Sequence, residues 1–330
     1  MGKIGVGVIG LGFWGELILD TLVGLRDAKI AAVSSRSGLR TAEIAEKYDA
    51  TGYTDFRELA QDRDVQIVVV ATEEDRHVEP TSAALEAGKH VFLEKPIASN
   101  LEDADTIIQK AKSSDSLVMV GHIFRFDARH AHAKELIKQG KIGNIASFFA
   151  KHNVVRKNYD IYNRVPLYMV SSIHEFDLAR WYLEDDAAEV YCIGNNALGE
   201  KVPDSYWITV KFRKGVVAAF QTVWLLPEAA PVWLDIDVEI IGTTGFIDLD
   251  TRNQGMSIWS PEGTKYPMYG MLPVIRGVPF GALRNELEYF LQCVQDGKEP
   301  NVLTLEDARA ALLIAVLAEE SYRTGRVVKA

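Results

Sequence analysis

Cysteine is scarce in this 330-residue sequence, which contains only Cys192 and Cys293, far apart along the chain. A disulfide framework is therefore not expected, and we predict a reducing, cytoplasmic location. Long apolar runs are also lacking, since none approaches the roughly 20 residues that a membrane span needs. Because the chain enters an apolar strand within its first few residues, we expect no signal peptide either.

Positive charge is also in short supply, because 46 Asp and Glu residues outnumber 36 Lys and Arg and give a formal net charge of −10. This balance argues against nucleic acid or an anionic membrane surface as a general partner. The histidines lack H-x-x-x-H spacing and the cysteines form no cluster, so no metal site is predicted. A Ser/His/Asp hydrolase is disfavoured because the sequence has no G-x-S-x-G turn.

The first third of the chain alternates strand and helix patterns. Strands are predicted at residues 4–9, 29–34, 65–71, 89–93 and 117–120, and helices at 14–23, 40–48, 80–87 and 101–111. Such alternation is typical of α/β proteins with right-handed crossovers. We therefore predict a doubly wound Rossmann domain over residues 1–122.

The pattern changes beyond that domain. Longer strands with period-two alternation are predicted at 144–152, 189–193, 206–212, 216–225 and 234–241, and helices at 131–139, 173–183, 282–295 and 305–323. In the last of these strands Asp235, Asp237 and Glu239 alternate with apolar residues, as in an antiparallel sheet with one solvated face. Residues 123–330 are therefore predicted to form an α+β domain on a large, mostly antiparallel, open-faced sheet.

A glycine-rich turn, Gly10-Leu-Gly12-Phe13-Trp14-Gly15, separates the first strand from the first helix. Gly10 permits a tight turn, Gly12 lets a pyrophosphate approach the backbone, and Gly15 lets the helix pack closely on the strand. The amino end of the helix, at Phe13 and Trp14, offers N–H groups to phosphates. This strand-turn-helix context predicts dinucleotide binding.

The identity of the dinucleotide is decided at the end of the second strand, about 20 residues further on. A carboxylate there would bind the ribose hydroxyls of NAD, but the sequence places Ser35, Arg36 and Arg40 in this region. Hydroxyl and guanidinium groups bind and neutralise a 2′-phosphate. NADP is therefore favoured, and NAD stays open because Arg36 lying over the adenine would suit either cofactor.

Lys95 follows the strand at 89–93 and precedes Pro96. Ligands of open α/β sheets bind at this carboxyl edge, where an amine can exchange protons with an alcohol. Glu94 would hold that amine in place. Taken alone, a lysine after a strand is more often a solvated strand end, and it is the nearby dinucleotide motif that favours catalysis.

Further candidates surround this edge. His174 and Asp177 are three residues apart and share a helix face, although a histidine at a helix start is often structural. The remaining candidates follow predicted strands or lie in polar loops. Thr72 and His77 are predicted near the cofactor, and His122, Arg125, Asn153, Arg156 and Tyr159 near the substrate.

These motifs in this order resemble the Gfo/Idh/MocA family, named after glucose–fructose oxidoreductase, inositol dehydrogenase and rhizopine catabolism. The likeness runs over nearly the whole chain. It includes the glycine turn, the segment Ala84–Ile97 with its Glu-Lys-Pro end, Val120-Gly-His, His174-x-x-Asp177-Leu-Ala-Arg-Trp and Glu239-Ile-Ile-Gly-Thr-Thr-Gly. The family implies a Rossmann domain and an open-faced sheet domain. It also implies NAD(P)-dependent chemistry on sugars or polyols, and homodimers or homotetramers formed through the sheet.

By this resemblance Lys95 matches the catalytic lysine of the family and His174 its catalytic histidine. Two positions depart from the common pattern. Val170 stands where many polyol dehydrogenases of the family carry an aspartate, and Glu73 follows Thr72 where many members have proline. The first departure leaves open whether Lys95 or His174 transfers the proton.

The sequence thus predicts an oxidoreductase that moves a hydride between nicotinamide and a secondary alcohol or ketone carbon of a sugar, cyclitol or sugar derivative. Three alternatives stay open. The chain could sense NADP without catalysis, reduce an imine or aromatic-diol substrate, or oxidise a nucleotide sugar.

Overall fold

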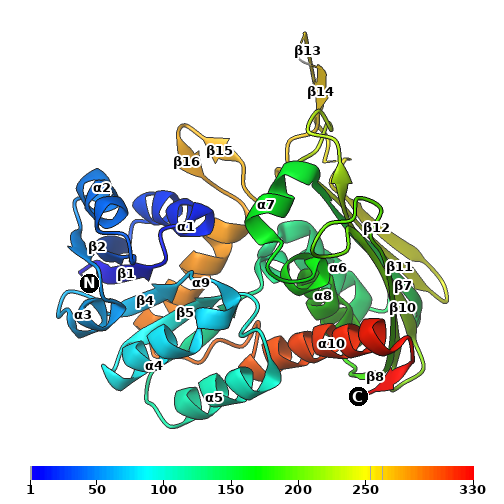
Figure 1. Cartoon of the computed structure of the whole chain (residues 1–330), viewed down its shortest axis with the longest axis horizontal. Coiled ribbons are helices and arrows are strands. Elements are labelled where there is room, and N and C mark those ends of the chain that lie inside the picture. Colours follow the sequence, from blue (N-terminus) through cyan, green and yellow to red (C-terminus); the bar gives the residue numbers. More distant parts are fainter. Residues whose placement is uncertain (1, 253, 262) are drawn as a thin grey trace. The chain divides into compact units, whose positions relative to one another are not determined.

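The computed structural model describes residues 2–252, 254–261 and 263–330 and divides into two compact units. The first unit runs to Phe126 and also includes Met271–Arg309, whereas the second comprises Asp127–Gly270 and Ala310–Ala330. Figure 1 shows the chain in sequence colours, with the returning segment in orange. The sequence analysis divided the chain into residues 1–122 and 123–330. It did not predict that residues 271–309 return to the first unit.

A six-stranded sheet with the order β3-β2-β1-β4-β5-β6 forms the centre of the first unit, and all of its pairings are parallel. The strands are β1 (Ile4–Ile9), β2 (Ala28–Ser34), β3 (Thr51–Tyr53), β4 (Ile67–Val70), β5 (His90–Glu94) and β6 (Val118–Gly121). The helices between them are α1 (Phe13–Val23), α2 (Gly38–Tyr48), α3 (Phe56–Gln61), α4 (Val78–Glu86) and α5 (Leu101–Lys112). The predicted Rossmann sheet is confirmed.

The strand order reverses beside β1, because β2 pairs on one side of it and β4 on the other. In open parallel sheets the crevice at such a switch point is where ligands bind. The central strands are buried on both faces, which is why β1 and β4 read as continuous apolar runs. β3 and α3 were not predicted, since they are too short to give a periodic pattern.

The returning segment completes the first unit. It contains the hairpin β15 (Val274–Ile275) and β16 (Val278–Pro279), and then α9 (Ala282–Asp296). The helix packs against α1, and its Phe290 ring lies 6.0 Å from the ring of Phe92 on β5. Residues far apart in sequence therefore share one core beneath the carboxyl edge of the sheet.

A seven-stranded sheet with the order β12-β11-β7-β10-β9-β8-β17 forms the second unit. Its strands are β7 (Ile145–Val155), β8 (Ala187–Asn195), β9 (Ser205–Phe212), β10 (Val217–Leu226), β11 (Leu234–Gly242), β12 (Phe246–Asp250) and β17 (Val328–Lys329). Every pairing is antiparallel except that of β7 with β10, which is parallel. The predicted mostly antiparallel sheet is confirmed.

The remaining elements cover this sheet or extend from it. They are α6 (Ala128–Lys138), α7 (Tyr159–Tyr162), α8 (Ile173–Leu183), the hairpin β13 (Ile258–Ser260) and β14 (Gly263–Lys265), and α10 (Leu305–Thr324), which begins in the first unit. Shorter helical turns lie at Glu74–Arg76 and Ile123–Phe126 in the first unit, and at Arg156–Asn158 and Tyr168–Ser172 in the second. α8 packs on the inner face of the sheet, where the rings of Phe176 and Phe220 meet edge to face with centroids 4.9 Å apart.

The outer face of this sheet is half apolar and half charged. The strand register places Ile193, Trp207, Gln221, Lys151, Asp237 and Asp250 in one row across six neighbouring strands. Trp207 is 48% exposed at the apolar side of this row. At the other side Lys151 Nζ lies 3.0 Å from Asp235 and 3.8 Å from Asp237.

No helix among the described residues combines the length and the apolar character that a membrane span requires. Cys192 and Cys293 are both buried free thiols.

Candidate cofactor and active site

The glycine-rich turn joins β1, α1 and β4 through backbone contacts that leave no room for side chains. Gly10 has φ +96°, and a Cβ at this position would lie 2.3 Å from the carbonyl oxygen of Ala71. A Cβ on Gly15 would lie 1.9 Å from the carbonyl oxygen of Gly10. These two glycines are therefore required by the fold, as the sequence predicted.

Gly12 is different, because a Cβ added there would meet no atom within 4 Å. Gly12 is also the N-cap of α1 and has no side chain to offer the first helical N–H groups. The turn thus presents open space next to backbone donors and the positive end of a helix. This cradle fits the pyrophosphate of a dinucleotide, with Phe13 and Trp14 in the first helical turn.

The end of β2 carries the groups predicted to select the cofactor. The Ser35 hydroxyl lies 3.0 Å from that of Thr41. Arg40 is held in place: it pairs with Glu16, lies 2.9 Å from Glu43 Oε2, and donates from Nε to the Leu11 carbonyl at 3.4 Å.

Arg36 is the more accessible cation of this region, with a side chain that is 73% exposed. Its Nη2 lies 3.5 Å from Oε1 of Glu73, which follows β4. Glu73 Oε2 lies 3.9 Å from Nε of Arg76. Ser35, Arg36 and Arg40 therefore gather at the edge of β2, and Arg36 is also joined to the end of β4.

His77 links two segments of the same edge. Its ring is buried, with Nδ1 3.0 Å from the Pro96 carbonyl oxygen and Nε2 3.2 Å from that of Thr72. Burial lowers the pKa of His77 below 6.5 and favours the neutral ring. His77 thus positions Thr72 against the turn that follows Lys95.

Glu94 and Lys95 lie at the end of β5. The Glu94 side chain packs against Gly121 of β6, where an added Cβ would lie 3.4 Å from Oε1, and its Oε2 accepts the Lys95 backbone N–H at 3.2 Å. Burial raises the pKa of Glu94 from 4.5 to about 7, while the Lys95 charge opposes the shift. Lys95 itself is half-buried, and the Lys95–Pro96 peptide bond is cis.

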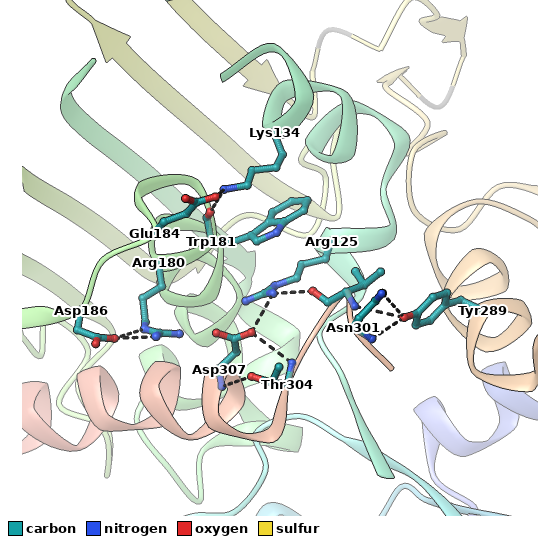
Figure 2. A network of polar contacts seen from close by, with 11 residues as sticks. Arg125, Lys134, Arg180, Trp181, Glu184, Asp186, Tyr289, Asn301, Thr304 and Asp307 are labelled. Atoms are coloured by element: carbon teal, nitrogen blue, oxygen red, sulfur yellow. Dashed lines mark hydrogen bonds and ion pairs between the residues drawn. The ribbon is translucent and has the colours of Figure 1, made fainter. Parts of the chain in front are cut away.

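His122 and Arg125 follow β6 and are both buried. Arg125 donates from Nη1 to the Val302 carbonyl oxygen at 2.7 Å and lies 3.3 Å from Asp307 Oδ2 (Figure 2). Asp307 and Thr304 form a reciprocal cap at the start of α10. In the structure Arg125 therefore anchors the loop that leads into α10, a partner that the sequence did not predict.

The second unit holds His174 and Asp177, both buried on α8. A π-helical turn, Tyr168–Ser172, directly precedes them and contains Val170. Such turns are frequent at functional sites. At the far end of α8, Lys134 bonds to the Trp181 carbonyl oxygen and lies 2.7 Å from Glu184 (Figure 2).

His152 and Glu175 are neighbours of His174 that the sequence analysis missed. His152 Nδ1 lies 3.0 Å from Glu175 Oε1, and both side chains are buried. The His152 ring is nearly parallel to that of His174, at 20° and 6.2 Å between centroids. The signal was available in part, because His152 alternates with Phe148 and Ala150 on the inward face of β7.

The three loop candidates of the second unit do not gather at one point. Asn153 lies on the opposite face of β7 from His152, and its Nδ2 donates to Asp235 Oδ2 at 3.3 Å. Arg156 pairs with Glu200 and lies over the ring of Tyr159, with 4.4 Å from Cζ to the centroid. Tyr159 accepts the Val202 N–H at 3.1 Å. Arg156 and Tyr159 are thus brought together, and Asn153 is apart from His174.

Within the described parts of the chain, no group of three or more His, Cys, Asp or Glu residues is arranged to hold a metal ion.

Family models match both parts of the chain. Residues 4–122 match the NAD-binding Rossmann fold of the Gfo/Idh/MocA oxidoreductase family, and residues 134–330 match its C-terminal alpha/beta domain. The chain belongs to this oxidoreductase family. The resemblance drawn from the motifs is confirmed, and so is the prediction of a nicotinamide-dependent oxidoreductase.

Relatives of the family span the full length of the chain. Myo-inositol 2-dehydrogenase of Thermotoga maritima is 29% identical and covers 98% of both chains. Scyllo-inositol 2-dehydrogenase (NAD(+)) of Bacillus subtilis is 28% identical over 98% of this chain and 95% of its own. The crystal structure of myo-inositol 2-dehydrogenase from Lactobacillus plantarum has the same fold, with a TM-score of 0.87 at 19% identity and 99% coverage of both chains.

We expect alanine substitutions at Gly15 and at Gly12 to affect different properties of the protein. Gly15→Ala should destabilise the fold by about 1–3 kcal/mol, because its methyl group meets the Gly10 carbonyl. Gly12→Ala should keep the melting temperature and weaken dinucleotide binding at least about tenfold, because its methyl group occupies the cradle. Thermal melts and cofactor titrations measure the two effects. Unchanged cofactor affinity in folded Gly12→Ala would contradict the assignment of the cradle.

The raised pKa of Glu94 implies that the stability of the fold depends on pH. Because its pKa rises from 4.5 to about 7 on folding, the native chain holds a proton that the unfolded chain releases between these values. The free energy of unfolding should therefore fall by roughly 3 kcal/mol as pH rises through this window. Glu94→Gln keeps the neutral shape and should lose this decrease. Urea titrations of both proteins at several pH values test it, and parallel curves would refute it.

Proposed function

We propose that this chain is an NADP-dependent dehydrogenase that acts on a secondary alcohol of a cyclitol or sugar, with inositols as the first candidates. The observation that carries the proposal is the half-buried Lys95 beside the buried Glu94, at the same sheet edge as the glycine cradle. The family match and the inositol dehydrogenases among the relatives support the substrate class.

In this proposal Lys95 binds the reacting oxygen of the substrate and stabilises the charge that develops on it. His174 takes the hydroxyl proton while the hydride leaves the carbon, and it returns the proton when a ketone is reduced. The bound nicotinamide supplies the acceptor of the hydride. Glu94 and His77 position the Lys95 segment. We propose His122 and Arg156 as further contacts of the substrate.

Val170 stands four residues before His174, where many polyol dehydrogenases of the family carry an aspartate, so that acid is absent here. We infer that Asp177, one helical turn beyond His174 and buried on the same helix, takes over the electrostatic part of that role. Glu175 does not, since it is already engaged with His152. His174 then has two acids nearby. Asp177 lies on its own helix face, and Glu175 contacts His152, whose ring is the neighbour of His174.

NADP is proposed from the groups at the end of β2. Ser35 and Arg36 follow the strand, and the segment from Ser34 to Thr41 contains no carboxylate to repel a 2′-phosphate. Since Arg40 is bound to Glu16 and Glu43, Arg36 is the principal cation for that phosphate in this proposal.

We also propose that the outer face of the second sheet pairs with another copy of the chain. Trp207, Ile193 and Tyr191 leave a large apolar area exposed on three neighbouring positions of β8 and β9. Apolar patches of this kind mark interaction surfaces, and most homo-oligomers close by two-fold symmetry. Light scattering of Trp207→Glu against the wild-type chain is the direct check. The cytoplasm is the compartment in which we place the reaction.

Lys95→Met should lower turnover strongly while leaving the cofactor bound. We expect kcat to fall about 10²–10⁴-fold on the best inositol or sugar of a panel, because the proton-handling amine is lost. Lys110→Met is the matched control, since Lys110 lies on α5 and forms a surface ion pair with Glu86 of α4. Near-normal turnover of Lys95→Met would refute its catalytic role, and absence of turnover in the wild-type chain across the panel would refute the proposed substrate class.

Ser35→Asp should exchange the cofactor preference. A carboxylate at the end of β2 repels the 2′-phosphate and accepts the ribose hydroxyls, so the ratio of kcat/KM for NADP over NAD should fall on the order of 100-fold. Ser37→Asp adds the same charge two residues away and keeps the cap of α2. Equal ratios for the two variants would contradict the proposed phosphate site.

A further inference from the structure

Glu73 occupies a position that the proposed reaction does not explain. It follows β4, whereas its partner Arg36 follows β2, and these two strands flank β1 in the sheet. The ion pair of 3.5 Å therefore spans the carboxyl edge above the end of β1, where the glycine turn begins. Because Gly10 packs against Ala71 and Thr72, the ends of β1 and β4 are held together beneath this pair.

This edge is where the adenosine half of a dinucleotide lies in a doubly wound sheet. A 2′-phosphate there needs the guanidinium of Arg36, which Glu73 already engages. The pair is weak, because its side chains are 73% and 42% exposed and its separation is long. It is therefore a contact that a phosphate can displace, at a cost in affinity.

The acids on the other side of the cradle do not compete in the same way. Glu16 and Glu43 neutralise Arg40, whose Nε also holds the Leu11 carbonyl, so that this cluster is part of the fold. Glu73 is different, because within the described part of the chain its second oxygen faces only the exposed Arg76, at 3.9 Å. Removing the Glu73 charge leaves Arg36 and Arg76 without the acid that they share.

We propose that Glu73 is a specificity residue that weakens the binding of the phosphorylated cofactor by competing with its 2′-phosphate for Arg36. The inference rests on the proposed use of NADP. Its consequence is that NAD, which lacks the phosphate and leaves the Arg36–Glu73 pair intact, is also accepted. The residue that stands where many family members have proline thereby keeps the cofactor preference moderate.

The test uses the adenosine half of the cofactor alone, so that catalysis is not needed. Adenosine 2′,5′-bisphosphate and adenosine 5′-monophosphate are titrated calorimetrically into the full chain at about 0.15 M salt, where the Debye length is about 8 Å. Glu73→Gln should bind the bisphosphate about fivefold more tightly, which is the upper range for a surface ion pair, and the monophosphate within about twofold of wild type.

Asp75→Asn is the matched control, because it removes the same charge from the same helical turn and contacts Arg76 rather than Arg36. It should change the affinity for the bisphosphate by less than about twofold, since the field at a screened surface falls off steeply. In the double variant Arg36→Met/Glu73→Gln the gain should disappear.

Two results overturn the inference. One is an equal gain in Glu73→Gln and Asp75→Asn, and the other is unchanged bisphosphate affinity in Glu73→Gln. If the wild-type chain binds the bisphosphate well in the second case, only the role of Glu73 fails. If neither protein binds it while both bind the monophosphate, the proposed use of NADP fails as well. A wild-type chain that binds it poorly and a Glu73→Gln chain that binds it well support the role of Glu73.

Discussion

The close backbone contact of the glycine turn is the constraint on which the rest of the first unit depends. Gly10 and Gly15 bring the end of β1, the start of α1 and the end of β4 within van der Waals distance. This packing leaves the N–H groups of α1 facing open space at Gly12. It also sets how far the loops after β2 and β4 stand from each other, and therefore which side chains meet across the crevice. The open cradle at Gly12 and the meeting of Arg36 with Glu73 both follow from two positions that tolerate no side chain.

The carboxyl edge of the same sheet carries Lys95, for which we propose a catalytic role, and its neighbours Glu94 and His77. Burial raises the pKa of Glu94 to about 7, and Lys95 lies half-buried directly after it. His77 ties the loop after β4 to the turn after Lys95. Glu94 and His77 are thus held by hydrogen bonds to backbone groups. Groups held in this way lose little freedom when a ligand binds.

The sequence predicted the parts of the molecule whose signal is local. The apolar runs of β1, β4 and β5 and the glycine spacing identify a doubly wound sheet, and the alternating acids of β11 identify the solvated face of the second one. The return of α9 to the first unit was not predictable, because the contact of Phe290 with Phe92 joins distant segments. The Arg125 anchor and the His152–Glu175 pair were missed for the same reason. Each is specified by a partner in another element rather than by spacing within its own.

The parallel pairing of β7 with β10 has a consequence for how the second unit is assembled. Antiparallel neighbours can be joined by a tight hairpin, but parallel ones need a crossover, and here the chain passes over the inner face as α8 before β8, β9 and β10 are made. The ribosome therefore releases the histidine-bearing helix before the strand that completes its floor has been synthesised. Phe176 on this helix gains its edge-to-face partner Phe220 only after β10 has been made, so a nascent chain stopped short of residue 217 holds the helix without this part of its packing.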